Sequence, residues 1–250
     1  MFVPSPISIF PVVGLPEVTP GMDLARQIVD ALPENPLQSG DVLVIAQKVI
    51  SKAEDARVNL NTVQPSRFAQ NWAREWGRDP RLVEVVLGQT RRIIRMERGL
   101  IISETHHGFV CANAGVDLSN TGQEETAILL PINPDQSAAT LRDGLKALTG
   151  KKVGVIVSDT FGRPWRSGLT QVALGSAGLS PVMDMREQPD AEGRELHVTM
   201  IALADEMACA ADLVCGKLNR VPVAVIRGYP ISGEGKAEEL IRPAEQDLFR

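Results

Sequence analysis

The chain has 250 residues, of which 44% are hydrophobic and 23% are charged, and its formal net charge is -5. This is the composition of a globular protein with one large domain or two small ones, and it excludes a disordered chain and a solenoid. No apolar run approaches the ~18 residues of a membrane span, and the acidic balance argues against a nucleic-acid or anionic-membrane surface.

The predicted elements alternate between short apolar strands and amphipathic helices. In chain order they are a strand at 7–13, a helix at 23–32, a strand at 42–46, helices at 65–76 and 80–87, a hairpin joining 100–103 to 108–111, a helix at 137–148, strands at 153–157 and 196–203, a helix at 205–214 and a strand at 221–226. This alternation indicates a mixed α/β class. No Gly/Ser-rich linker divides the chain, so we expect any second lobe to be interwoven with the first.

The cysteines and the N-terminal segment indicate the compartment. Cys111, Cys209 and Cys215 are too few and too scattered for a disulfide framework or a four-cysteine zinc site. The N-terminal segment lacks a basic region followed by a long apolar region, so it does not resemble a signal peptide. We therefore expect a reduced, cytoplasmic protein.

Several common catalytic and nucleotide-binding motifs are missing. The sequence contains no G-x-S-x-G elbow and no G-x-G-x-x-G after a strand, and the segment 228–236 has the wrong spacing for a P-loop. A bound nucleotide is therefore held in some other way. The three histidines, His106, His107 and His197, make an all-histidine metal site improbable, and the adjacent pair is more typical of a turn.

Two polar clusters follow predicted buried strands. Residues 113–120 come after the strand at 108–111, and residues 158–166 come after the strand at 153–157. Functional groups gather at the carboxyl ends of strands in open α/β sheets, where loops rest on a rigid scaffold. Asp117 and Asp159 with a neighbouring hydroxyl would form a hard oxygen ligand set that suits Mg²⁺ or Mn²⁺. The alternative is that both aspartates are turn formers or helix caps.

Two lysine-containing segments are candidates for phosphate binding. Lys48 and Lys52 lie four residues apart directly after the strand at 42–46, and a lysine binds phosphate as a point charge. Gly216 and Lys217 follow the helix at 205–214. Taken alone, the first pair is more typical of two solvated lysines at a helix start, and the second is an ordinary helix C-cap.

These clusters, in this order, resemble the coenzyme F420-0:L-glutamate ligase family, the gamma-glutamyl ligases of the deazaflavin coenzyme F420. The resemblance spans positions 10–229. The matching stretches are FPVVGLPEV, GDVLVIAQKVISKAE, NAGVDLSN, LLPINPDQSA, SDTFGRPWRSGLTQVALGSAG, GRELHVT, ADEMACAADLVCGK and VPVAVIRGY.

The resemblance implies a fold and an activity. The fold would be the gamma-glutamyl ligase-like mixed α+β fold with interwoven subdomains, forming one catalytic domain over residues 1–250 without a C-terminal flavin reductase domain. The activity would be GTP-dependent ligation of L-glutamate to F420-0 through an acyl phosphate, by a homodimer with two Mg²⁺ or Mn²⁺ ions per site and K⁺ as a further candidate cation. Rival interpretations are a ligase for another acid and a non-catalytic nucleotide-binding regulator.

The resemblance also implies roles for individual residues. Asp117, Asp159 and Thr160 would hold the metals, and the two aspartates and Arg166 would serve catalysis. The GTP-binding residues would be Leu15, Pro16, Glu17, Val18, Gln47, Lys48, Lys52, Asn120, Leu213, Val214, Cys215, Gly216, Lys217, Leu218 and Asn219.

The segment 163–166 is assigned to the F420-0 acceptor. Arg163 and Arg166 flank Trp165. Forked arginine donors suit a phosphodiester or a carboxylate, and an indole suits the flat deazaflavin ring. The alternative is that Trp165 belongs to the core.

Overall fold

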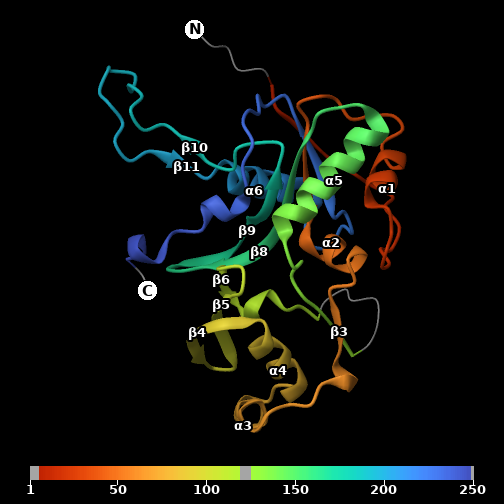
Figure 1. The fold of residues 1–250 in the computed structure, drawn as a ribbon, viewed down its shortest axis with the longest axis vertical. Coiled ribbons are helices and arrows are strands. Elements are labelled where there is room, and N and C mark those ends of the chain that lie inside the picture. The colour runs from red at the N-terminus through yellow and green to blue at the C-terminus, as the bar shows by residue number, and fades with distance from the viewer. Residues whose placement is uncertain (1–5, 119–124, 249–250) are drawn as a thin grey trace.

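The computed structural model describes residues 6–118 and 125–248, and its main body is built on a five-stranded sheet (Figure 1). The strand order is β1-β12-β2-β8-β9. The strands are β1 (Ser8–Pro11), β2 (Val42–Ala46), β8 (Gly154–Arg163), β9 (Arg166–Ala177) and β12 (Val223–Arg227). Only β2 and β8 pair in parallel, and the other neighbours are antiparallel.

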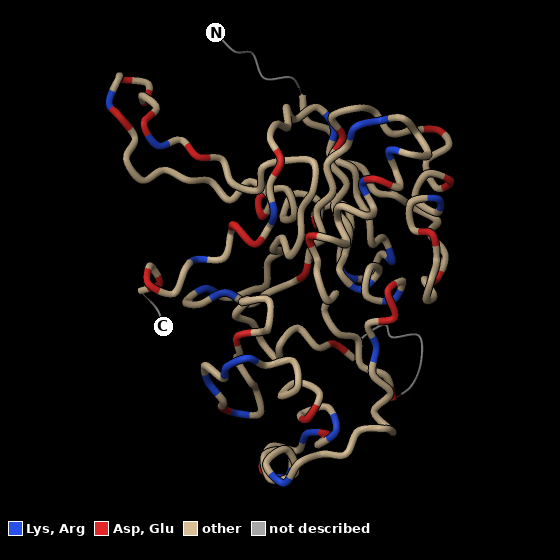
Figure 2. The backbone as a smooth tube through the Cα atoms, in the orientation of Figure 1, with Lys and Arg blue, Asp and Glu red and all other residues tan. Residues whose placement is uncertain are grey.

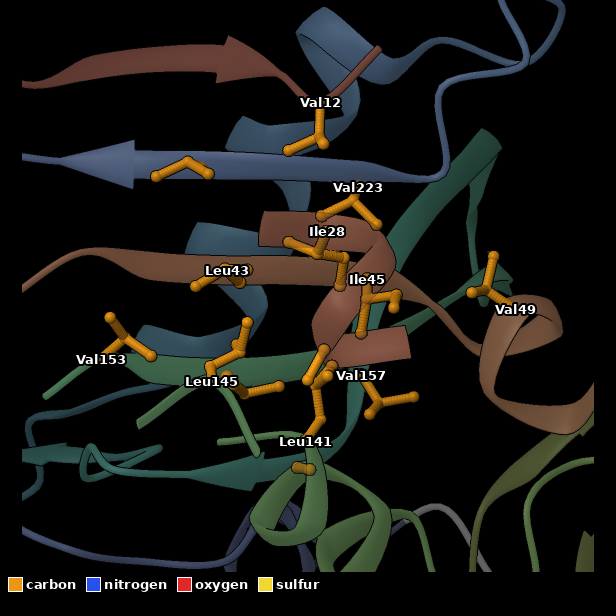
Figure 3. Close-up of a cluster of buried hydrophobic side chains, with 14 of the residues drawn as sticks. Val12, Ile28, Leu43, Ile45, Val49, Leu141, Leu145, Val153, Val157 and Val223 are labelled. Atoms are coloured by element: carbon orange, nitrogen blue, oxygen red, sulfur yellow. The ribbon is translucent and has the colours of Figure 1, made fainter. Parts of the chain in front are cut away.

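Both faces of this sheet are buried at its centre, because β2 is apolar at every position. Leu43 and Ile45 of β2 pack on one face, and Val42 and Val44 pack on the other. The first face is covered by α1 (Leu24–Asp30) and α5 (Pro134–Thr149), and Figure 3 shows part of this core. The second face is covered by α6 (Leu203–Cys215). The site is therefore carried on a sheet held from both sides.

A second lobe is formed within the chain, between α2 (Gln47–Ala53) and α5, and it lies below the main body in Figure 1. It has its own hydrophobic core, to which α3, α4 and β5 contribute. Its elements are β3 (Arg57–Asn59), η1 (Leu60–Thr62), α3 (Arg67–Trp76), α4 (Pro80–Gly88), β4 (Thr90–Glu97), β5 (Leu100–Thr105), β6 (Val110–Ala112), η2 (Asn113–Gly115) and β7 (Thr126–Ile128). The chain is thus a mixed α/β protein with interwoven subdomains.

Most predicted elements are confirmed, and some with the same bounds. The strand at 42–46 is β2, and the predicted hairpin is the antiparallel pair β5–β6, in which Ser103 faces Cys111. The helices also form, with ends set by caps. Asn133 caps the first turn of α5 by accepting from the Gln136 N–H, and Gly150 ends that helix in the left-handed conformation.

Two predictions were wrong. Residues 158–166 are not a loop, because β8 continues through them to Arg163 and turns into β9, forming an antiparallel ribbon. The segment 196–203 is not a continuous strand. Only β11 (Met200–Ile201) pairs, with β10 (Met183–Asp184), and Leu203 already begins α6. Val198 is 87% exposed there, so this apolar side chain of the predicted alternating pattern does not pack against a core. Figure 2 shows acidic and basic residues along the projecting segment 182–202.

Within the described ranges, no helix is both long and apolar enough to cross a membrane. Two short 3₁₀ turns, η3 (Ala237–Leu240) and η4 (Ala244–Gln246), complete the described chain.

A buried ion pair joins the end of β12 to the start of β2. Asp41 is 1% exposed, and Arg227 binds it with two parallel hydrogen bonds of 2.8 Å, from Nε to Oδ1 and from Nη2 to Oδ2. The guanidinium also donates to Asn35 Oδ1 and lies 5.1 Å from the centre of the Phe10 ring. The pair therefore ties three segments to one edge of the central strands.

We predict that Arg227→Ala lowers the free energy of unfolding by about 3–5 kcal/mol, because it leaves the Asp41 carboxylate buried without its cation. Urea unfolding measures the change. Arg186→Ala removes an exposed arginine that also pairs bidentately with an aspartate, Asp184, and should leave the midpoint unchanged. Equal midpoints for the two variants would show that the buried pair does not hold these segments.

Candidate active site

The candidate site lies where β2 ends beside β8. Their parallel register pairs Ala46 with Ser158, so Lys48, in the first turn of α2, and Asp159, the next residue of β8, lie at the same end of the β2–β8 pair. The turn η2 brings Asp117 to this edge from the second lobe, and Lys48 Nζ lies 2.5 Å from Asp117 Oδ2. Three segments far apart in the sequence thus contribute charged groups to one place.

The electrostatics of Asp159 show that these groups influence one another. Burial raises the pKa of Asp159 to about 6, and the charge of Asp117 acts in the same direction. The Thr160 N–H, Lys48 and Lys217 oppose this rise in the pKa. The buried thiol of Cys111 has its pKa raised to about 12, by burial and then by the charge of Asp159. Two carboxylates and two lysines therefore share one partly desolvated field.

The residues present fit a divalent cation of the magnesium type. Across residues 6–118 and 125–248, no group of three or more His, Cys, Asp or Glu side chains is arranged to hold a metal. A cation at Asp117 and Asp159 would therefore complete its shell with other oxygens, such as phosphate or water, as Mg²⁺ does. The mutual repulsion of the two carboxylates is the cost that such a cation would offset.

The Thr160 hydroxyl belongs to a small network that the sequence analysis missed. Gln171 Nε2 donates to Thr160 Oγ1 over 2.9 Å and to Asp212 Oδ1 over 3.1 Å. Gln171 faces Thr160 across the β8–β9 ribbon, and Asp212 lies in the last turn of α6. No sequence signal points to Gln171 once residues 158–166 are taken for a loop.

The segment 15–18 and the helix α2 lie together, as the predicted nucleotide site requires. Lys52 is 8% exposed, and its ammonium forms an ion pair with the exposed carboxylate of Glu17. Val18 is buried in the same core as Val49 of α2, and Leu15 packs against that core. Lys52 is one helical turn from Lys48, so α2 presents two cations along one side.

Gln47 is more deeply buried than a nucleotide ligand usually is. It is 1% exposed, and its Oε1 accepts from Ser51 Oγ over 2.8 Å. Its Nε2 has no hydrogen-bond partner within the described part of the chain. The buried amide N–H is thus a donor that remains available next to Lys48.

The end of α6 presents the remaining predicted nucleotide residues. Leu213 and Leu218 are 85% and 91% exposed. Gly216 ends the helix with φ of 60° and ψ of 164°, a backbone conformation that favours glycine. Lys217 is the next residue, and its charge lowers the pKa of Asp159. Asn120 lies outside the described residues.

Arg166 is placed apart from the aspartates. In the β8–β9 ribbon, Arg166 is opposite Arg163 in the strand register at the tip. Arg163 follows Asp159 by four residues of β8, which is about 13 Å at about 3.3 Å per residue. Trp165, in the turn, has φ of 58° and is 81% exposed, so the core interpretation of this tryptophan is wrong. The ribbon carries two arginines and an indole outward from the carboxylates.

Comparison with known proteins identifies the family. A sequence model described as F420-0:Gamma-glutamyl ligase matches residues 13–228. The chain belongs to this family. A Coenzyme F420:L-glutamate ligase of Methanothermobacter thermautotrophicus is 46% identical over 250 residues, covering 98% of this chain and 99% of the relative.

Two further members of the family carry the same name. The Methanopyrus kandleri protein is 44% identical over 94% of each chain. The Methanocaldococcus jannaschii protein is 42% identical, over 88% of this chain and 89% of its own. Both similarities extend across the second lobe as well as the main body, so the lobe that supplies Asp117 is part of the shared family architecture.

We predict that Asp159→Asn raises the free energy of unfolding of the chelator-treated protein. A rise in pKa from 3.8 to about 6 corresponds to about 3 kcal/mol. The side chain is partly exposed, which reduces the expected gain to about 1–2 kcal/mol. Urea unfolding in EDTA measures it. Asp184→Asn is the neutral control, because Asp184 is exposed and its surface ion pair with Arg186 contributes little to the free energy of unfolding. A destabilised Asp159→Asn would contradict the unfavourable burial of the Asp159 charge near Asp117.

Proposed function

We propose that this chain joins L-glutamate to coenzyme F420-0 and so acts in coenzyme F420 biosynthesis. The observation that carries the proposal is the match, over nearly the whole chain, to relatives named Coenzyme F420:L-glutamate ligase. The geometry supports it, because an acidic pair beside lysines suits a reaction on phosphates and carboxylates. Further γ-linked glutamates could be added to the same tail.

The proposed reaction activates the acceptor carboxylate with GTP. The terminal lactyl carboxylate oxygen of F420-0 attacks the γ-phosphorus of GTP, which forms an acyl phosphate and releases GDP. The α-amine of glutamate then attacks the acyl carbon, loses a proton, and expels inorganic phosphate as the amide forms. Such transfers ask a protein mainly for positioning and charge neutralisation.

The residues divide this work between them. Asp117, Asp159 and Thr160 would hold Mg²⁺ or Mn²⁺, which neutralises phosphate charge when bound. Lys48 is already held in the site by its ion pair with Asp117 and would stabilise the negative charge on the transferred group. Lys217 adds a second cation from the end of α6.

The nucleotide would be bound without a P-loop. The segment 15–18 is joined to Lys52 by the Glu17 ion pair, and the segment 213–219 brings the charge of Lys217 to bear on Asp159. Gln47, next to Lys48, has an N–H with no partner among the described residues. We further propose a cytoplasmic homodimer, with K⁺ as an additional ion. The β8–β9 ribbon exposes Leu169, and the segment 182–202 exposes Val198 and Met200. A second copy of the chain would cover these apolar side chains.

The direct test is mass spectrometry of F420-0 after incubation with the protein, GTP, Mg²⁺ and glutamate. We expect an acceptor heavier by one or more glutamyl residues, with GDP and phosphate formed only when both acceptor and glutamate are present. Asp159→Asn should abolish this turnover without unfolding the protein. Glutamylation of a different acid would support the rival ligase. GTP binding without any product would support a regulator.

Lys52 gives a test of the nucleotide assignment. Lys52→Met keeps much of the buried side-chain volume and removes the charge, so GTP affinity should fall by about one to two decades, since a charge-assisted contact is worth about 1.5–3 kcal/mol. Calorimetry measures it. Lys236→Met, which removes a lysine that also forms an ion pair but lies outside the predicted nucleotide site, should not weaken GTP binding. Unchanged affinity in Lys52→Met would return this lysine to a structural role.

The ribbon tip gives a test of the acceptor assignment. Trp165→Ala combined with Arg166→Ala should raise the KM for F420-0 at least tenfold more than the KM for GTP, because an indole stacks on flat rings and a guanidinium binds phosphodiesters. Both side chains are exposed, so the unfolding midpoint should stay that of the wild type. Equal losses for both substrates would place the acceptor elsewhere.

A further inference from the structure

Gln171 joins three elements at one atom. Its Nε2 lies 2.9 Å from Thr160 Oγ1 in β8 and 3.1 Å from Asp212 Oδ1 in α6, while Gln171 itself belongs to β9. Thr160 is the residue directly after Asp159 and is itself a proposed metal ligand. The Gln171 amide therefore contacts a ligand of the proposed metal site and not the metal itself. Neither the family resemblance nor the proposed function gives Gln171 or Asp212 a role.

The partners decide which way the Gln171 amide faces. The Asp212 carboxylate accepts the hydrogen bond from Gln171 over 3.1 Å. The amide nitrogen, and not the amide oxygen, must therefore face Asp212. Because the same nitrogen faces Thr160, the Thr160 hydroxyl is obliged to accept. Its own proton and its second lone pair are then directed away from Gln171.

The backbone of β9 is clamped to α6 on both sides of this network. Asp205 Oδ1 accepts from the Ala173 N–H over 2.7 Å. Cys209 Sγ donates to the Gln171 carbonyl over 3.3 Å and lies 3.0 Å from Thr170 Oγ1. Asp205, Cys209 and Asp212 are at intervals of about one helical turn, so one side of α6 grips the strand. The Gln171 amide is thereby held at a set distance from Thr160.

We propose that Gln171 is a positioning residue, which fixes the Thr160 hydroxyl as an acceptor from the protein and so presents its free lone pair and proton to the cation–phosphate group of the bound nucleotide. This rests on the proposed function, because it takes the ligand beside Thr160 to be a divalent-cation complex of GTP. Asp212 acts one step further back, by fixing the orientation of the amide. We call the chain of contacts from Asp212 through Gln171 to Thr160 the relay. The end of α6 thus contributes to the site in two ways, through this relay and through the proposed nucleotide-binding segment 213–219.

The test is a double-mutant cycle read by the calorimetric affinity for Mn²⁺–GTP without acceptor or glutamate, and by kcat in the full reaction. Thr160→Val and Gln171→Leu should each lower affinity or kcat by about tenfold or more, the usual cost of losing a group that orients a metal ligand. The double variant should lose no more than Thr160→Val alone, because Gln171 acts through Thr160. Thr170→Val, which removes a neighbouring hydroxyl outside the relay, should change neither quantity more than about twofold.

Gln171→Glu separates orientation from space filling. Glutamate has nearly the same shape, but its carboxylate can only accept, so it would accept a hydrogen bond from the Thr160 hydroxyl and would repel Asp212. We expect a loss at least as large as that of Gln171→Leu. A Gln171→Glu protein with wild-type affinity and kcat would overturn the proposal, and so would losses that multiply in the double variant.

The outcome for the proposed function is read separately. If the wild type binds Mn²⁺–GTP but forms no glutamylated F420-0, the proposed function fails while the cycle in affinity still decides the relay. If the wild type binds no Mn²⁺–GTP at all, the relay proposal is overturned, because it has no ligand to act on. Unfolding midpoints of all variants are measured alongside, and Thr160→Val serves as the reference for any loss of stability.

Discussion

The parallel pairing of β2 with β8 is the constraint on which the candidate site depends. It is the one parallel contact in the five-stranded sheet, and its register brings Ala46 level with Ser158. The charged groups of the site follow from this level of the sheet. Lys48 comes just after the end of β2, Asp159 comes next in β8, and Asp117 from the second lobe pairs with Lys48. A shift of the register by one residue would turn the side chains of β8 to the opposite face and separate these groups.

The site concentrates charge where the fold would otherwise be apolar. Asp41 is buried with Arg227 as its partner. Asp159, in contrast, is desolvated and feels the like charge of Asp117, and the Thr160 N–H, Lys48 and Lys217 offset this only in part. Such an arrangement costs stability in the free protein and is retained where a ligand supplies the missing charge. A chain with a net charge of -5 can still take an anionic nucleotide and an anionic acceptor if cations are gathered at the point of contact.

Sequence patterns predicted the parts of the fold that obey one periodicity. Strand β2 is apolar throughout, and α5 has a proline at its first turn and a glycine after its last, so both were predictable from local signals. The β8–β9 ribbon was not, because its outer half is exposed on both faces and carries no alternation. Its strands are recognisable only from their pairing with each other.

The site was predictable to the same extent. Polar residues directly after apolar strands indicated Asp117, Asp159 and Lys48, and the structure brings them together. The Gln171–Asp212 contact joins residues 41 positions apart and depends on how α6 packs against the edge of β9, which no local pattern encodes. The ion pair of Lys52 with Glu17 likewise arises from tertiary contact.

We propose that the lobe and the main body together form one cation and nucleotide centre at Asp117 and Asp159. Anomalous diffraction from crystals grown with Mn²⁺ and GTP tests this proposal. We expect manganese peaks beside both carboxylates, with phosphate oxygens of GTP completing the shell. Manganese bound elsewhere, or GTP bound with no metal at either aspartate, would contradict it.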